Sequence, residues 1–286
     1  MSNNYFDFHC HLDHERFDPG ESERIDREVI LKKMKGLGID ALTIGTDLNS
    51  SRAACALAET NDHIWACVGQ HPLDNPTELF QADRYQQLIN THPKVVCIGE
   101  CGLDYYWPTK QLVSGELSED DLTAEKERQA VLLQHNIDLA LENDLPLMLH
   151  VRSSEDTQDA HEDVLRILEG QQEKLGDTKI AFHFYTEDAA LAQRIIAAGC
   201  YVSLPGVITF PKEAEKMNEV IRVVPVERLF CETDSPYAAP QKYRGKTNMP
   251  LYVSEVYEKV AETKGIGVSD LQEQIRKNLY QFLGIQ

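Results

Sequence analysis

The chain has 286 residues, of which 42% are hydrophobic and 26% are charged, and its formal net charge at pH 7 is −19. This composition is typical of a soluble globular protein with enough apolar residues for a large core. The negative charge argues against a protein that coats nucleic acid, but not against a nuclease that concentrates cations in one cleft.

Segments that would direct the chain to a membrane or out of the cell are not apparent. No apolar run approaches the ~20 residues of a membrane span. The first residues, "MSNNYFDFHCHLD", contain neither a basic region nor a long apolar stretch, so a secretory signal is not supported. The seven cysteines form no CxxC pair, which indicates buried free thiols. We therefore expect a cytoplasmic protein without a membrane partner.

Short apolar runs alternate with helical patterns along the whole chain. The runs predict strands at 5–9, 38–46, 64–72, 94–105, 145–152, 179–184, 200–206 and 228–236. Helices are predicted at about 22–35, 51–60, 82–92, 123–143, 161–168, 188–199, 213–224 and 251–283. Eight such repeats favour an α/β fold, a (β/α)₈ TIM barrel, over an open sheet. No linker divides the chain, so we expect one domain over 1–286, with an acidic surface loop at 108–121.

Polar residues stand at the predicted C-terminal ends of these strands, where barrel enzymes build their active sites. His9 and His11 are one residue apart, so their side chains lie on the same face of a strand. Later strand ends carry further possible ligands, namely Glu100, His150, His183 and Asp234. Singly each signal is weak, since a strand-end histidine is often structural and "ETDSP" suits a helix N-cap. Jointly they predict a site for two divalent ions bridged by a carboxylate.

Several stretches resemble the TatD family of metal-dependent hydrolases, which belongs to the amidohydrolase-like TIM barrels. The matching stretches are "DFHCHLD", "GQHP", "IGECGLDYYW", "LPLMLHVR", "HEDVLRIL", "ETDSPY" and "YRGKTNMP". The resemblance implies metal ligands at His9, His11, Glu100, His150, His183 and Asp234. The chain departs from the family where Glu187 replaces a glycine and where Asn248-Met249-Pro250 replaces Asn-Glu-Pro. These departures concern specificity rather than chemistry.

The roles expected of these residues follow from two-ion hydrolysis. Glu100 is expected to bridge the ions, and Asp234 to bind metal and accept the proton of the attacking water. His71 cannot easily join the metal cluster from the third strand, so it is expected either to contact substrate or to cap its own "GQHP" turn. Glu232 is expected to orient one of the ligands. Cations expected to bind phosphate are Arg152, Lys242, Arg244 and Lys246.

Three functions remain open at this stage. By resemblance, the first is a deoxyribonuclease that acts exonucleolytically on DNA ends, with two divalent ions that could be Zn, Mn, Ni or Mg. The alternative is a metal-dependent amide or ester hydrolase, because related barrels use the same ligands. The third is a binding protein that retains the fold without catalysis. The remaining histidines are expected to be structural or solvated, namely His14, His63, His92, His135 and His161.

Overall fold

The computed structural model describes residues 4–18 and 26–285, and its strands form one sheet of eight parallel strands in chain order. The strands are β1 (Tyr5–Cys10), β2 (Ile39–Ile44), β3 (Ile64–Val68), β4 (Val95–Asp104), β5 (Leu147–Arg152), β6 (Ile180–Phe182), β7 (Tyr201–Leu204) and β8 (Leu229–Cys231). The prediction of a (β/α)₈ barrel is confirmed.

The first and last strands meet just beyond the end of β8. Cys10 and Ser235 form a parallel bridge, and the His11 N–H donates to Ser235 O over 2.8 Å. The Asp234 N–H donates to His9 O over 2.9 Å. Because these bonds join the two ends of the sheet beside His9, His11 and Asp234, barrel closure also holds these side chains together.

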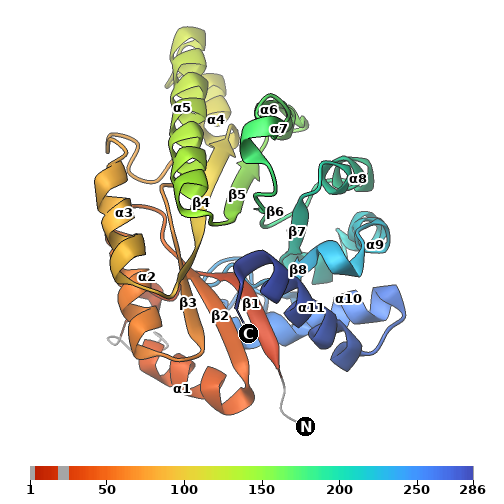
Figure 1. Ribbon diagram of the computed structural model, residues 1–286. Helices are drawn as coiled ribbons and strands as arrows, with labels where there is room; N and C mark the ends of the chain where they lie inside the picture. Colours follow the sequence, from red (N-terminus) through yellow and green to blue (C-terminus); the bar gives the residue numbers. More distant parts are fainter. Residues whose placement is uncertain (1–3, 19–25, 286) are drawn as a thin grey trace.

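The helices lie outside the strands, as Figure 1 shows. They are α1 (Arg27–Leu37), α2 (Leu48–Thr60), α3 (Ala82–Thr91), α4 (Tyr106–Ser114), α5 (Glu119–Asn143), α6 (Asp159–Glu169), α7 (Gln172–Leu175), α8 (Ala189–Ala197), α9 (Ala214–Val223), α10 (Val253–Lys264) and α11 (Val268–Leu283). The 25-residue α5 extends well beyond the strands, with α4 beside it. None of the described helices is both long and apolar enough to cross a membrane.

The core consists of inward-facing strand residues and the apolar faces of the helices. Phe8 of β1 stacks on Phe230 of β8 with ring centroids 3.9 Å apart, and Phe282 of α11 packs edge-on against both. All ten residues of β4 are buried, as expected for a parallel strand covered on both faces. This packing fixes the strand ends on which the polar residues stand.

Two predicted boundaries are wrong, and one prediction falls partly outside the described residues. The predicted loop at 108–121 is instead most of α4, a short connection at 115–118 and the beginning of α5. Gly265, in the left-handed conformation (φ 68°), divides the predicted helix 251–283 into α10 and α11. Residues 22–25 of the predicted helix 22–35 lie outside the described part, and the rest begins α1 after the N-cap Asp26.

Candidate metal centre

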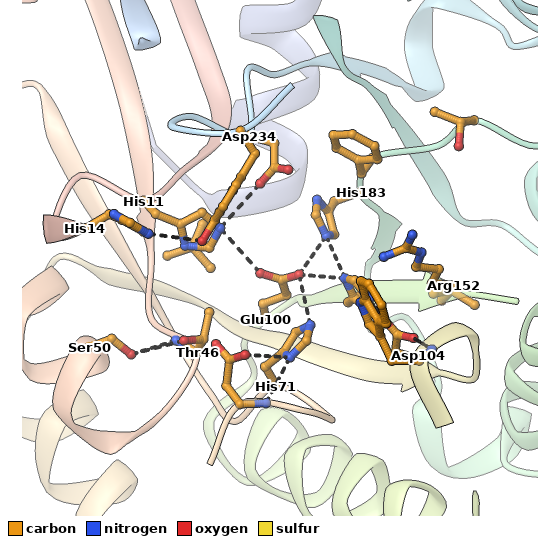
Figure 2. A pocket seen from close by; sticks show the side chains of 18 of the residues that line it. His11, His14, Thr46, Ser50, His71, Glu100, Asp104, Arg152, His183 and Asp234 are labelled. Carbon is orange, nitrogen blue, oxygen red and sulfur yellow. Dashed lines mark hydrogen bonds and ion pairs between the residues drawn. The ribbon is translucent and has the colours of Figure 1, made fainter. Parts of the chain in front are cut away.

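A cavity of about 820 Å³ opens at the C-terminal ends of the strands. Residues at the ends of every strand except β7 line it, and Figure 2 shows His11, His71 and His183 around one carboxylate, that of Glu100. The predicted residues in its wall are His11, His71, Glu100, His150, Arg152, His183 and Asp234. His9 is fully buried behind this wall. The six predicted ligands therefore surround one site.

The two oxygens of Glu100 face two different groups of histidines. Glu100 Oε2 is 3.3 Å from His9 Nε2 and 3.7 Å from His11 Nε2. Glu100 Oε1 is 2.8 Å from both His150 Nδ1 and His183 Nε2. Glu100, on β4, thus offers one oxygen to the histidines at the end of β1 and the other to those at the ends of β5 and β6. The arrangement suits a carboxylate that bridges two cations.

Backbone packing brings His150 this close to Glu100. Gly102 of β4 has a φ of 143°, and a Cβ built on it would lie 1.9 Å from His150 O. Any larger residue would push β5 away from β4. The glycine after "GEC" in the sequence therefore has a positional role in the site.

His150 and His183 each face Glu100 with one ring nitrogen, and a carboxylate orients the ring through the second nitrogen. His150 Nε2 is 3.1 Å from Asp104 Oδ2, and His183 Nδ1 is 3.3 Å from Glu232 Oε1. A carboxylate on one nitrogen holds the proton there and leaves the lone pair of the other nitrogen for a cation. The structure thus places Glu232 where the sequence analysis expected an orienting residue.

Asp104 is a site residue that the sequence analysis missed. It is 2% exposed, and it accepts hydrogen bonds from the N–H groups of Tyr106 and Trp107 as well as facing His150. Its position could have indicated this role, because residues four apart on a strand lie on the same face, and Asp104 is four residues after Glu100. Asp104 therefore joins the beginning of α4 to the metal-ligand candidate His150.

His71 lies closer to the cluster than expected. Its Nε2 is 3.8 Å from Glu100 Oε1, and with Glu100 and His150 it forms one of the groups that could hold a metal ion. Its Nδ1 accepts hydrogen bonds from the N–H groups of Leu73 and Asp74. At this distance His71 could join the cluster, contrary to the expectation from the sequence. Nδ1 thus caps the turn that holds the ring, and Nε2 faces the cavity.

Asp234 stands on a loop that is fastened from both sides. Asp7, buried on β1, accepts from the backbone N–H and the hydroxyl of Thr233 over 2.8 and 2.5 Å. Asn248 Nδ2 donates to Thr233 O and Tyr237 O over 2.7 and 2.6 Å. Asp234 Oδ1 then lies 3.4 Å from His11 Nε2, with 15% of the side chain exposed. The carboxylate is fixed in place and open to the cavity.

The electrostatics of the site favour positive charge on both sides of Glu100. Although burial opposes it, nearby His183 and His9 hold the pKa of Glu100 well below its usual range. Burial alone would lower the pKa values of His11 and His150, but bonds to Asp234 and to Asp104 and Glu100 raise each to about 9. Burial and nearby His183 lower the pKa of His9 to about 3.

The donor set fits divalent metal ions. Three groups of side chains hold their ligand atoms within 4.8 Å of one another, and these atoms are imidazole nitrogens and carboxylate oxygens. A mixed nitrogen and oxygen set suits Zn, Mn or Ni, and Mg where water completes the shell. The residues present therefore fit the metals that the sequence predicts.

The predicted phosphate-binding cations are separated by the structure. Arg152 lies in the cavity wall, with its guanidinium 3.9 Å from the ring centroid of Tyr106. Lys242 instead pairs with Glu255, and Arg244 lies over Phe210. Lys242, Arg244 and Lys246 stand on an exposed segment after β8 and are not among the described residues that line the cavity.

Glu187, His14 and His161 also lie in or near the cavity wall. Glu187 lines the cavity, as its replacement of a glycine near the site suggested, and burial raises its pKa. His14 also lines the cavity, where its Nε2 is 3.1 Å from the hydroxyl of Tyr237, so it is not merely solvated. His161 is buried and meets Ser153, which confirms a structural role.

Comparison with known proteins identifies the family. The family described as TatD-related DNase matches residues 6–284. The chain belongs to this family. It is 33% identical over 284 residues to an uncharacterized metal-dependent hydrolase of Mycoplasma genitalium, covering 96% of this chain and 97% of that protein. The predicted resemblance is confirmed, and with it a hydrolase of the metal-dependent TatD type.

Two other relatives bear on the fold and the activity. The 3′-5′ ssDNA/RNA exonuclease TatD of Escherichia fergusonii is 29% identical over 267 residues, covering 91% of this chain and 94% of that protein. The crystal structure of a TatD homologue from Escherichia coli superimposes with a TM-score of 0.82 at 26% identity, covering all of both chains. The TatD relationship therefore extends over the whole barrel.

Proposed function

We propose that this TatD-family hydrolase cleaves phosphodiester bonds at the ends of single-stranded nucleic acid, with two divalent ions as cofactors. The observation that carries the proposal is the position of Glu100, whose two oxygens face two separate histidine groups 2.8–3.7 Å away. The exonuclease relative supports the substrate class. Membership of the DNase family supports it as well.

The metal ligands in this proposal are His9 and His11 on one side and His150 and His183 on the other, with Glu100 between them and Asp234 beside the first pair. When bound, the ions would lower the pKa of a water molecule and polarise a phosphoryl oxygen. Glu232 and Asp104 orient His183 and His150, so that the free ring nitrogens point inwards.

The remaining steps belong to side chains in the cavity wall. Asp234 accepts the proton of the attacking water, because its carboxylate is partly open to the cavity and adjoins the ligand cluster. His71 donates from Nε2 to a phosphate oxygen, while its Nδ1 caps the turn that holds it. The guanidinium of Arg152 binds the phosphate. Arg244 and Lys246 have no part in this proposal, because they do not line the cavity.

The ligand candidates come from β1, β4, β5, β6 and the segment after β8, so we propose that residues 1–286 act as one catalytic domain. All seven cysteines are buried and free, which supports a reducing, cytoplasmic location. The alternative, an amide or ester hydrolase, draws no specific support from the site and is tested as an outcome below.

The test is turnover and metal content of the wild type and of Glu100→Gln, each reconstituted with Zn, Mn, Ni or Mg. The substrates are a single-stranded DNA end, a small phosphodiester and an amide. We expect the wild type to bind two ions and hydrolyse the DNA end. Glu100→Gln should lose at least one ion and about 10²-fold or more in kcat, because an amide cannot bridge two cations.

Glu119→Gln, at the exposed beginning of α5, is the matched control and should behave as the wild type. Circular dichroism checks that both variants are folded. Two bound ions and near-normal turnover in Glu100→Gln would contradict the bridge. Cleavage of the amide without cleavage of either phosphodiester would favour the alternative function.

A further inference from the structure

Trp107 is an aromatic side chain that the proposed mechanism leaves unused. It stands in the first turn of α4, lines the cavity beside Arg152, and is 54% exposed. A large aromatic ring left half exposed in a cavity is unusual, because burying it would remove a large apolar area from water. We therefore expect a planar group of the substrate to stack on the indole.

The place of Trp107 is fixed relative to the proposed metal ligands. Its backbone N–H and that of Tyr106 point to Asp104 Oδ1 over 3.4 and 3.0 Å, while Asp104 Oδ2 faces His150. One buried carboxylate thus joins the beginning of α4 to a ligand candidate. The backbone from which the indole projects is therefore linked to the proposed metal site.

A cation lies next to the indole. The Arg152 guanidinium is 5.7 Å from the ring centroid of Trp107, and its position is set by stacking on Tyr106. In the described part of the chain, its side chain has no hydrogen bond or ion pair, so its donors are available to a ligand. An indole face beside such a guanidinium matches the base and the phosphate of one nucleotide.

The remaining space suits a nucleotide. A cavity of about 820 Å³ is within the size range of sites that hold small organic ligands. Every nucleobase has a π face, so a stacking contact binds bases without selecting their sequence. That property is what an enzyme that removes successive nucleotides from an end requires.

We propose that Trp107 is the stacking platform for the base of the nucleotide whose phosphate is cleaved, with Arg152 on the same nucleotide's phosphate. The proposal rests on the proposed function and deepens it, because it names a base-bearing nucleotide as the preferred substrate over a phosphodiester without a base. Trp107 is a binding residue here and takes no part in proton transfer.

Binding is tested first, without turnover. The chain has two tryptophans, and Trp65, on β3, packs against Phe6 and Lys94 away from the cavity lining. In a Trp65→Phe protein reconstituted with metal, the fluorescence excited at about 295 nm reports on Trp107 alone. Deoxyadenosine 5′-monophosphate should quench this fluorescence, and deoxyribose 5-phosphate, which carries the same phosphate, should not. Equal responses to both ligands would overturn the proposal.

Kinetics give the second readout. Base stacking contributes about 1–3 kcal/mol per base, which corresponds to about 5- to 160-fold in binding. Trp107→Ala should therefore lower kcat/KM on a short single-stranded oligonucleotide by about this factor. On an abasic oligonucleotide of the same length, kcat/KM should stay the same. The bond to Asp104 comes from the backbone, so alanine keeps it.

Three controls sharpen the result. Trp107→Phe keeps a ring and should restore part of the loss, whereas Trp107→Leu keeps apolar bulk and should not. Val113→Ala changes an exposed residue of α4 outside the cavity lining and should have no effect. Equal losses on the base-bearing and abasic substrates would overturn the stacking role. If the wild type cleaves neither oligonucleotide with any metal, the proposed function itself fails.

Discussion

Asp234 lies beside the proposed metal ligands, and its carboxylate is also open to the cavity, where it could accept a proton. Its Oδ1 is 3.6 Å from His9 Nε2 and 3.4 Å from His11 Nε2, and the loop around it is held by Asp7 and Asn248. The carboxylate is thus kept in one place without being enclosed. Such a group can accept a proton and return to the same position after each turnover.

We predict that Asp234→Asn lowers kcat by about 10²-fold or more and changes KM little, because asparagine keeps the shape but cannot accept the proton. Steady-state kinetics on a single-stranded substrate would measure this, with the metal content determined in parallel. Asn248→Ala offers a comparison, since it loosens the loop and leaves the carboxylate chemically intact. A rise in KM with kcat unchanged would assign Asp234 to substrate binding instead.

Residues at strand ends could be located from the sequence because a parallel barrel turns chain order into position. His9, His11, Glu100, His150 and His183 all lie on or directly after strands that their apolar neighbours identified. Asp104 was missed because the pattern drew attention to Glu100, although both stand on one face of β4. Arg244 and Lys246 could not be placed relative to the cavity from the sequence, because they stand on an irregular segment whose path no periodicity determines.

At the scale of elements, α4 shows why local composition misled. The segment 108–121 contains a proline, a glycine and several acidic residues, which is a common loop composition. Pro108 lies in the first turn of α4, where a missing N–H costs nothing. Ser118 and Asp121 form a capping box that begins α5, and the acidic residues stand in its first turn. The proline, the glycine and the acidic residues of this segment are thus residues of helix ends, although their composition resembles that of a loop.

The packing of α6 against the barrel makes a pH-dependent contribution to stability. His161 of α6 is 3% exposed and lies against Phe182 and Tyr185. Burial, helped by nearby His150, lowers its pKa from 6.5 to about 4. Between these two pH values, the unfolded chain takes up a proton that the folded protein does not. Stability therefore falls as the pH drops from 6.5 towards 4.

We predict that His161 accounts for a loss of up to about 3 kcal/mol over this range, since each pKa unit corresponds to about 1.4 kcal/mol. Urea unfolding of the wild type and His161→Gln from pH 7 to 4 would test it. The variant should be less stable at pH 7, and the difference should shrink towards pH 4. His135→Gln, at an exposed position of α5, is the control and should follow the wild type. A constant difference across the range would show that His161 does not titrate in this way.

For the whole molecule, the barrel was predictable because eight strand and helix repeats leave few arrangements. Its closure was not, because the contacts of Cys10 with Ser235 and of His9 with Asp234 join segments more than 200 residues apart. No local pattern encodes such pairs. These long-range contacts also bring the first and last ligand candidates together, so the complete site forms only when the barrel closes.

The net charge of −19 opposes binding of the proposed substrate, because that substrate is a polyanion. Arg152 is a cation in the cavity wall, whereas Lys242, Arg244 and Lys246 lie outside its described lining. Salt screens two opposite effects here, the general repulsion by the acidic surface and the local attraction by Arg152 and the bound metals. The net salt dependence of the wild type should therefore be shallow.

We predict that Arg152→Ala changes the slope of log kcat/KM against log salt by about 0.7, towards weaker loss of activity with salt, since one phosphate contact on a single strand contributes about −0.7. Kinetics on a short oligonucleotide at several salt concentrations would measure both slopes. Arg244→Ala removes the same charge outside the cavity lining and should leave the slope as in the wild type. If Arg244→Ala changes the slope and Arg152→Ala does not, the substrate crosses the exposed segment after β8 instead of passing Arg152. A small neutral amide substrate would give no such slope in any of the three proteins, because it carries no phosphate whose counterions a side chain could release.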